Sequence, residues 1–408
     1  MLVICSDIHF SDGTLDPFNV PAYAFRIVLD HLKAILERPG NRVKDIEIVL
    51  LGDIFDLLRT DQWKPDDRRA PMPWTSPDEE LERRVDGILA RLLQKNDEAV
   101  TLMTQSGARL EKDVTLRYLP GNHDRALNRF RSTRERLVRA LHLDHDPEAP
   151  FDLCGSWPRY NLFGEHGDRL DDFNREQPAS HSCVGDAFVI HVMNNFFLRT
   201  RELLSEKRLE GEERLLAAVQ EVDHVRPKWA TIVWLRDLIS KVRNTEARQA
   251  LAQGWGSALE GFLALDLDEL GIPADPRLLQ LLRQLVQTGP SLLENPVVRT
   301  MLAESDGAYI RAAQEEIARH HGAVDYVVNG HTHRSRHVPL SRNGDRLQTY
   351  FNTGTWRHTI NLVQTPDSEA RLLASWEEMS FLVFYDPEES FGLPGKSYRY
   401  EMWQGMRS

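Results

Sequence analysis

Short apolar runs alternate with longer segments of helical spacing along the first half of the chain. Apolar or alternating runs of strand length begin at Leu2, Ile46, Val114 and Tyr160. Between the first two runs, apolar side chains recur at intervals of three and four residues over residues 25–36. A second helix is expected over residues 78–105, after a loop of residues 60–77 rich in Pro, Asp and Arg. This alternation predicts an α/β fold.

Helical spacing dominates the middle of the chain. Asp275 followed by Pro276 is a typical helix start. The apolar stripe expected after it consists of Leu278, Leu279, Leu281, Leu282 and Leu285. Strand-like runs resume at residues 326–329, 347–351, 381–385 and 398–403. We therefore predict a core formed by residues 1–176 and 322–408, interrupted by a helical insertion, or cap, of residues 177–321.

The most apolar part of this insertion is residues 184–198. We interpret it as a helix in the insertion's own core, with a surface for an acyl chain or a membrane as the alternative. The two ends of the insertion follow and precede polar signatures described below. A cap in this position is expected to select substrates by size and shape and not by charge.

The composition and net charge indicate a globular protein and argue against some classes of partner. The 408 residues are 41% apolar and 27% charged, which is typical of a globular protein. No signal peptide and no apolar run of membrane-spanning length is found, so we expect a cytoplasmic protein without stable membrane insertion. Three cysteines without a CxxC pair argue against a disulfide framework. The net charge of −12 disfavours bulk nucleic-acid binding, but a nuclease stays open because bound metal ions can dominate local charge.

Polar signatures follow the strand-like runs. They are SDIH (residues 6–9), GDIFD (52–56), GNHD (121–124), EHGD (165–168) and GHTH (330–333). The loops at the carboxyl ends of strands in an open α/β sheet converge on one crevice, so these side chains are expected to share one site. Imidazole and oxygen ligands without thiolate suit Mn²⁺, Fe or Zn²⁺ better than Ca²⁺ or Mg²⁺.

Taken together and in this order, the five signatures resemble the calcineurin-like metallophosphoesterase superfamily. The resemblance covers residues 1–174 and 324–403 and implies an αββα sandwich with two divalent metal ions per chain, most often Mn²⁺. By resemblance, the first metal is held by Asp7, His9, Asp53 and His333. The second metal is held by Asp53, Asn122, His166 and His331. Asp53 would then bridge the two ions, as two-metal hydrolases require.

The same resemblance implies roles for residues beside these ligands. A metal-bound hydroxide would attack phosphorus, and His123 would act on the departing oxygen while Asp124 holds its ring. Asp56 and Asp168 are expected to orient ligands. The arginines that follow signatures could clamp a phosphate, although solvated arginines are commoner; they are Arg125, Arg169, Arg175 and Arg334.

The substrate is less sharply predicted. The run GEHGDRLDDFN (residues 164–174) is similar to bacterial members such as the UDP-2,3-diacylglucosamine pyrophosphatases, but those usually have Arg in place of His123 and a much smaller insertion. GNHD and GDIFD also recur in SbcD-type nucleases and in cyclic-nucleotide phosphodiesterases. We expect a phosphodiesterase or phosphatase for a small or medium phosphoester. The alternatives are a nucleotide-glycolipid pyrophosphatase, a nuclease, or a non-catalytic scaffold.

Overall fold

The computed structural model describes residues 1–63, 70–207, 212–226, 228–277, 279–280, 283, 306–344, 346–364, 371–386, 388–389 and 399–407. The leucine stripe predicted over residues 278–285 lies mostly outside these residues. Residues 64–69 of the predicted loop and Tyr398 of the last predicted strand also lie outside them.

Two mixed sheets form the centre of the fold. The first has the order β3-β2-β1-β11-β10-β6, with β12 also paired to β11. Its strands are β1 (Leu2–Cys5), β2 (Asp45–Leu51), β3 (Asp113–Leu119), β6 (Val225–Arg226), β10 (His358–Gln364), β11 (Arg371–Phe384) and β12 (Tyr400–Arg407). β1, β2 and β3 run parallel, and β11 is antiparallel to β1, with Val3 opposite both Ile48 and Val383. This is the parallel strand arrangement expected from the strand–helix alternation.

The second sheet has the order β4-β5-β7-β9-β8. Its strands are β4 (Cys154–Trp157), β5 (Leu162–Glu165), β7 (Tyr326–Asn329), β8 (Ser335–Asn343) and β9 (Arg346–Thr353). β5, β7 and β9 are parallel, whereas β4 and β8 pair antiparallel at the two edges. The sheet therefore joins strands that precede the predicted insertion with strands that follow it.

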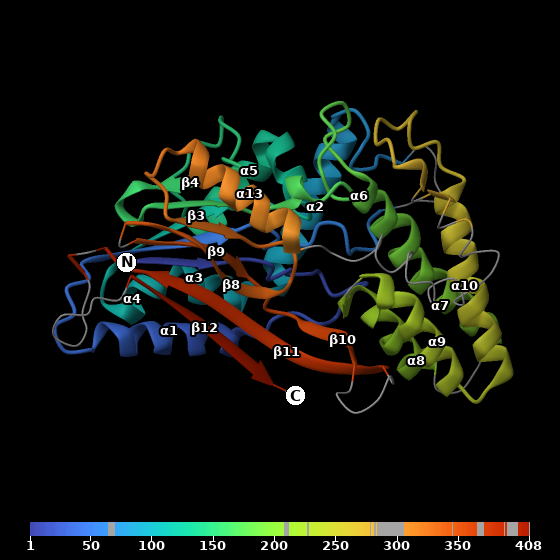
Figure 1. The fold of residues 1–408 in the computed structure, drawn as a ribbon. Helices are drawn as coiled ribbons and strands as arrows, with labels where there is room; N and C mark the ends of the chain where they lie inside the picture. The colour runs from blue at the N-terminus through green and yellow to red at the C-terminus, as the bar shows by residue number, and fades with distance from the viewer. Residues whose placement is uncertain are drawn as a thin grey trace.

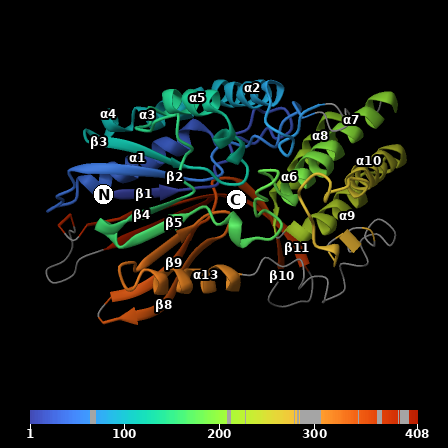
Figure 2. The same cartoon turned by 90° about the horizontal axis from the view of Figure 1, so that it is seen from above.

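The sheets lie between two helical layers, which Figures 1 and 2 show from two sides. Leu2 and Ile4 of β1 pack in a cluster between the sheets, while Val3 and Cys5 pack with the helices, because successive strand residues point to opposite faces. The helices on this side are α1 (Ala22–Leu36), α2 (Glu79–Lys95), α3 (Asp97–Thr104), α4 (Ser106–Leu110) and α5 (Arg131–Leu141). On the other side, α13 (Asp306–Arg319) packs on the second sheet. The predicted α/β class is confirmed.

The single helix predicted over residues 78–105 is wrong in length. The structure has α2 and α3 in that range, with α4 beginning at Ser106. Asp78 starts α2 as predicted, since its side chain accepts from the backbone N–H of Leu81. Asn96 ends α2 because its amide donates to the carbonyl oxygens of Leu92 and Ser11, at 2.8 and 3.0 Å. The apolar spacing continues past Asn96 and by itself predicts one long helix, but the side-chain hydrogen bonds of Asn96 end the helix there.

Further helices lie at one end of the sheets (Figure 1). They are α6 (Val184–Phe188), α7 (Asn195–Lys207), α8 (Glu212–Gln220), α9 (Thr231–Lys241) and α10 (Thr245–Leu263), with a π-helical turn at Val189–Asn194. Phe196 packs edge-on against Trp255, with ring centroids 5.3 Å apart. Residues 184–198 contribute many side chains to the main apolar cluster. This supports the helical-core interpretation of that segment over a surface for lipid.

The predicted boundaries of the insertion need correction. β6, inside the range 177–321, pairs parallel with β10 and so belongs to the first sheet. α13, also inside that range, packs through Tyr309, Ala313 and Ile317 on the second sheet. A two-residue strand has no readable periodicity, and helical spacing does not tell which layer a helix covers. The insertion is therefore built into the core at both places.

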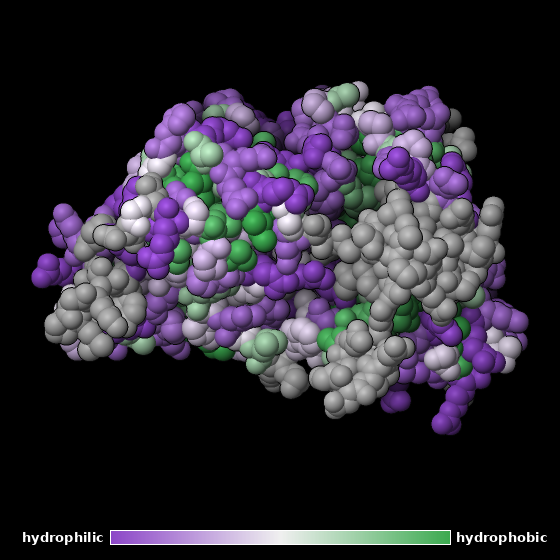
Figure 3. Space-filling model, in the orientation of Figure 1, coloured by the Kyte–Doolittle hydropathy of each residue, from purple (hydrophilic) through white to green (hydrophobic). Residues whose placement is uncertain are grey.

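The face in Figure 3 is mainly hydrophilic, with smaller apolar areas. Among the described residues, no helix is both long enough and apolar enough to cross a membrane.

Candidate metal centre

The predicted ligands meet where strands of both sheets end. Asp7 and His9 follow β1, Asp53 follows β2, and Asn122 follows β3. From the second sheet, His166 follows β5, and His331 and His333 follow β7. Residues more than 300 positions apart are thus neighbours, and all seven predicted ligands lie in or beside one buried cluster.

The backbone at this cluster is unusual. Five predicted ligands have positive φ angles, which few residues other than glycine adopt. They are Asp7 (53°), His9 (51°), Asp53 (53°), His331 (71°) and His333 (56°). Such conformations cost free energy and gather at functional sites, where surrounding structure holds side chains in fixed directions. The side chains here are also closely packed. A Cβ at Gly52, in the second signature, would collide with the His166 ring, so only glycine fits at that position.

Asp7, His9 and His333 form the first group of potential ligands. Nε2 of His333 lies 3.3 Å from Oδ1 of Asp7 and 3.1 Å from Nε2 of His9. All three side chains are almost completely buried. Two imidazole nitrogens and a carboxylate at this spacing are a donor set suited to a divalent transition metal.

Asp53, His166 and His331 form the second group. Oδ2 of Asp53 lies 3.1 Å from Nε2 of His166 and 3.6 Å from Nε2 of His9, so one carboxylate faces both groups. Nε2 of His166 and Oδ1 of Asn122 are among the buried side-chain atoms that have no hydrogen-bond partner in the described part of the chain, although Nε2 of His166 lies close to Asp53. Buried polar atoms are normally satisfied, so these two atoms fit the role of metal ligands.

In three of the histidines, one ring nitrogen lies against an oxygen acceptor. Nδ1 of His9 lies 3.3 Å from Oδ2 of Asp56, and Nδ1 of His166 lies 3.0 Å from the carbonyl oxygen of Leu51. Nε2 of His331 lies 3.1 Å from Oδ2 of Asp171. Metal-ligating histidines usually donate their second ring N–H to such acceptors. The predicted orienting role of Asp56 agrees with its contact to His9.

The predicted partner of His123 is wrong. Nδ1 of His123 lies 2.9 Å from Oδ1 of Asp56, not against Asp124. Asp124 instead accepts from the backbone N–H groups of Gly121 and Ile54, at 2.6 and 2.9 Å. Asp124 thus holds the second and third signature loops together, while Asp56 contacts two histidines. The sequence placed Asp124 beside His123, but neighbours along a turn need not face each other.

Electrostatics at the cluster favour charged ligands. Burial alone would raise the pKa of Asp7, but hydrogen bonds with His333 and His9 hold it well below its usual value. Burial also opposes ionisation of Asp53, yet the charges of His166 and His123 hold its pKa well below normal. Carboxylates must be deprotonated to bind metal, and the lowered pKa of both groups favours that form. Burial and the Asp53 charge raise the pKa of Asp124 to about 6.

The arginines after the signatures mostly have protein partners. Arg125 is buried, donates to the carbonyl oxygen of Asn174 at 2.7 Å and lies 3.5 Å from Asp168. Arg169 pairs with Glu165. Arg175 pairs with Asp172 at 2.6 Å, and Arg334 is half-buried. Asp168, predicted to orient a ligand, is therefore the partner of Arg125, and Asp171 contacts the ligand ring instead.

Sequence reasoning also missed a charged network behind the first group. Arg226 of β6 donates from Nη2 to Nδ1 of His333 at 2.7 Å. Arg357 pairs with Asp16 and, at 2.9 Å, with Asp223. Asp223 and Arg226 belong to the predicted insertion, whose polar residues carry no signature. Asp171 could have been found, since it and Asp172 form an acidic pair shortly after EHGD.

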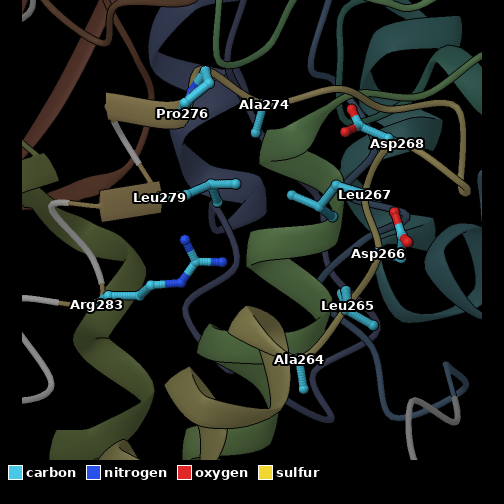
Figure 4. Close-up of a pocket in the computed structure, with 9 residues that line it drawn as sticks. All are labelled: Ala264, Leu265, Asp266, Leu267, Asp268, Ala274, Pro276, Leu279 and Arg283. Carbon is cyan, nitrogen blue, oxygen red and sulfur yellow. The ribbon is translucent and has the colours of Figure 1, made fainter.

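A separate cavity of about 440 Å³ lies in the insertion (Figure 4). Leu265, Leu267 and Leu279 line it together with Asp266 and Arg283. None of the predicted ligands is among its lining residues, so it is distinct from the histidine and aspartate cluster.

No protein-family model matches the chain, and no curated protein matches it.

Proposed function

We propose that this protein is a metal-dependent phosphoester hydrolase, acting as a phosphodiesterase or phosphatase. The observation that carries the proposal is the convergence of seven metal-ligand residues, from five separate signatures, on one buried cluster. Asp7, His9, Asp53 and His333 would hold one divalent ion. Asp53, Asn122, His166 and His331 would hold the other. The carboxylate of Asp53, which faces both groups, fits a bridging ligand.

Divalent ions bound here would neutralise charge on phosphoryl oxygens and lower the pKa of water. The chain itself supplies an acid for the departing oxygen. Asp56 accepts from Nδ1 of His123, which fixes the ring. In the imidazolium form, Nε2 would carry the proton that passes to the departing oxygen. The same carboxylate contacts His9, so one aspartate sets the orientation of a proposed ligand and of the proposed acid.

The proposal is tested by loading metal-free protein with Mn²⁺ and assaying a panel of phosphomonoesters, phosphodiesters, nucleotide pyrophosphates and single-stranded DNA. Hydrolysis that depends on added metal is expected, and the panel separates the phosphatase, phosphodiesterase, pyrophosphatase and nuclease alternatives. His145→Ala is a suitable control, because this half-buried histidine contacts the nearby Ala149 carbonyl oxygen and stacks on the Phe151 ring. A fully loaded protein that hydrolyses no member of the panel would favour the non-catalytic alternative.

A further inference from the structure

Arg226 reaches the proposed first metal position from outside the five signatures. It lies on β6 and is 5% exposed. Its Nη1 donates to the carbonyl oxygens of Asp223 and Val225, at 2.6 and 2.9 Å. Its Nη2 donates to Nδ1 of His333 at 2.7 Å. The guanidinium is therefore held in a fixed direction against a proposed ligand.

This contact differs in kind from those of the other imidazoles. His9 and His331 lie against carboxylates, and His166 lies against a carbonyl oxygen. Such acceptors increase the electron density of the ring and strengthen it as a ligand. Arginine has only donors and is permanently charged, so the ring of His333 must accept from it. A neutral imidazole that accepts at Nδ1 carries its hydrogen on Nε2, so Nε2 of His333 offers no free lone pair to a metal ion while this contact lasts. The guanidinium charge also repels a metal ion on the other side of the ring.

We propose that Arg226 is a positioning residue that weakens metal binding at the position formed by Asp7, His9, Asp53 and His333. The insertion thereby makes this ion the more weakly held of the two. This proposal rests on one part of the proposed function, namely that these four residues bind a metal ion.

The test measures metal affinity and not activity. Metal-free protein is titrated with Mn²⁺ by calorimetry in a His166→Ala background, which removes a ligand of the second position and leaves the first to be measured. Arg226→Met is expected to tighten binding about tenfold, the lower end of the effect of outer contacts on metal affinity. Arg226→Lys keeps the charge and is expected to stay close to the parent. If Arg226→Met does not fold, Arg226→Gln carries the same expectation, since it removes the charge and keeps a donor.

Arg248→Met is the matched control, because Arg248 lies exposed on α10 and contacts Thr245 at 3.1 Å. Loss of a merely structural contact would weaken binding, so tightening has the opposite sign to damage. Unchanged or weaker Mn²⁺ binding in folded Arg226→Met would overturn the proposal. If the wild-type protein binds no Mn²⁺ at all, the proposed function itself fails, which is a distinguishable result.

Discussion

The two proposed metal positions differ in what lies behind their ligands. At the second position, His166 and His331 are braced by Leu51 and Asp171, which both belong to the predicted core. At the first position, His333 is contacted by Arg226, which the insertion supplies. The first position is thus completed by a segment that the signatures do not include. The two ions are expected to differ in affinity even though their ligand types are similar.

The carboxylate of Asp53 faces both positions, so changing it should have the largest effect. Asp53→Asn is expected to weaken both ions and to lower turnover by at least ~10³, or more than about 4 kcal/mol of transition-state stabilisation. Metal content and steady-state rates measure this. Asp172→Asn is the control, because that carboxylate is exposed and pairs only with nearby Arg175 in its ion pairs. Two bound metals and a near-normal rate in Asp53→Asn would remove the bridging assignment.

A change at His123 should lower the rate of hydrolysis without changing the metal content at either position. His123→Ala is expected to keep both metals and lose ~10²–10⁴ in rate, because it removes the proposed acid. The loss should shrink for substrates with acidic leaving groups, which need no proton. Rates are compared across phosphoesters of graded leaving-group pKa. Equal losses across the series would indicate that His123 orients the substrate.

Arg357 links the predicted insertion to the core beside the first metal position, because it pairs with one aspartate from each. It is 2% exposed and pairs with Asp16 and Asp223. Arg357→Met leaves two buried carboxylates without this partner and is expected to destabilise the fold by about 3–5 kcal/mol. Urea unfolding of metal-free protein measures the change, with Arg109→Met, an exposed arginine paired with Asp30, as the control. A cost below about 1 kcal/mol, typical of exposed pairs, would mean that the network does not hold the insertion in place.

Asp171 tests the second position by itself. Asp171→Asn is expected to weaken Mn²⁺ binding there about 10–100-fold, since His331 loses its carboxylate brace. Mn²⁺ calorimetry measures the change. In an Asp171→Asn and Arg226→Met double variant, the two changes should appear at separate positions with opposite signs. A weakening of both positions by Asp171→Asn alone would show that they do not respond independently.

Local sequence pattern predicted several strands and the polar residues that follow them, but not the contacts between distant segments. The strands at Leu2, Ile46 and Val114 and the clustered polar residues after them were predicted because each signature follows a short apolar run. The partner of His123, the strand at Val225 and the layer of α13 were missed. Each depends on contacts between distant segments, which no periodicity encodes. For the same reason, replacing residues 177–320 by a linker is not expected to spare the core, because that deletion removes β6 and α13.

The central claim is that this cluster holds two metal ions. The most direct measurement is the metal content of wild-type protein after loading with Mn²⁺ and desalting, by elemental analysis together with electron paramagnetic resonance. The account predicts two ions per chain with a spin-coupled Mn²⁺ signal, reduced in Asp53→Asn. A protein that retains no metal, or whose metal content is the same in wild type and Asp53→Asn, would contradict it.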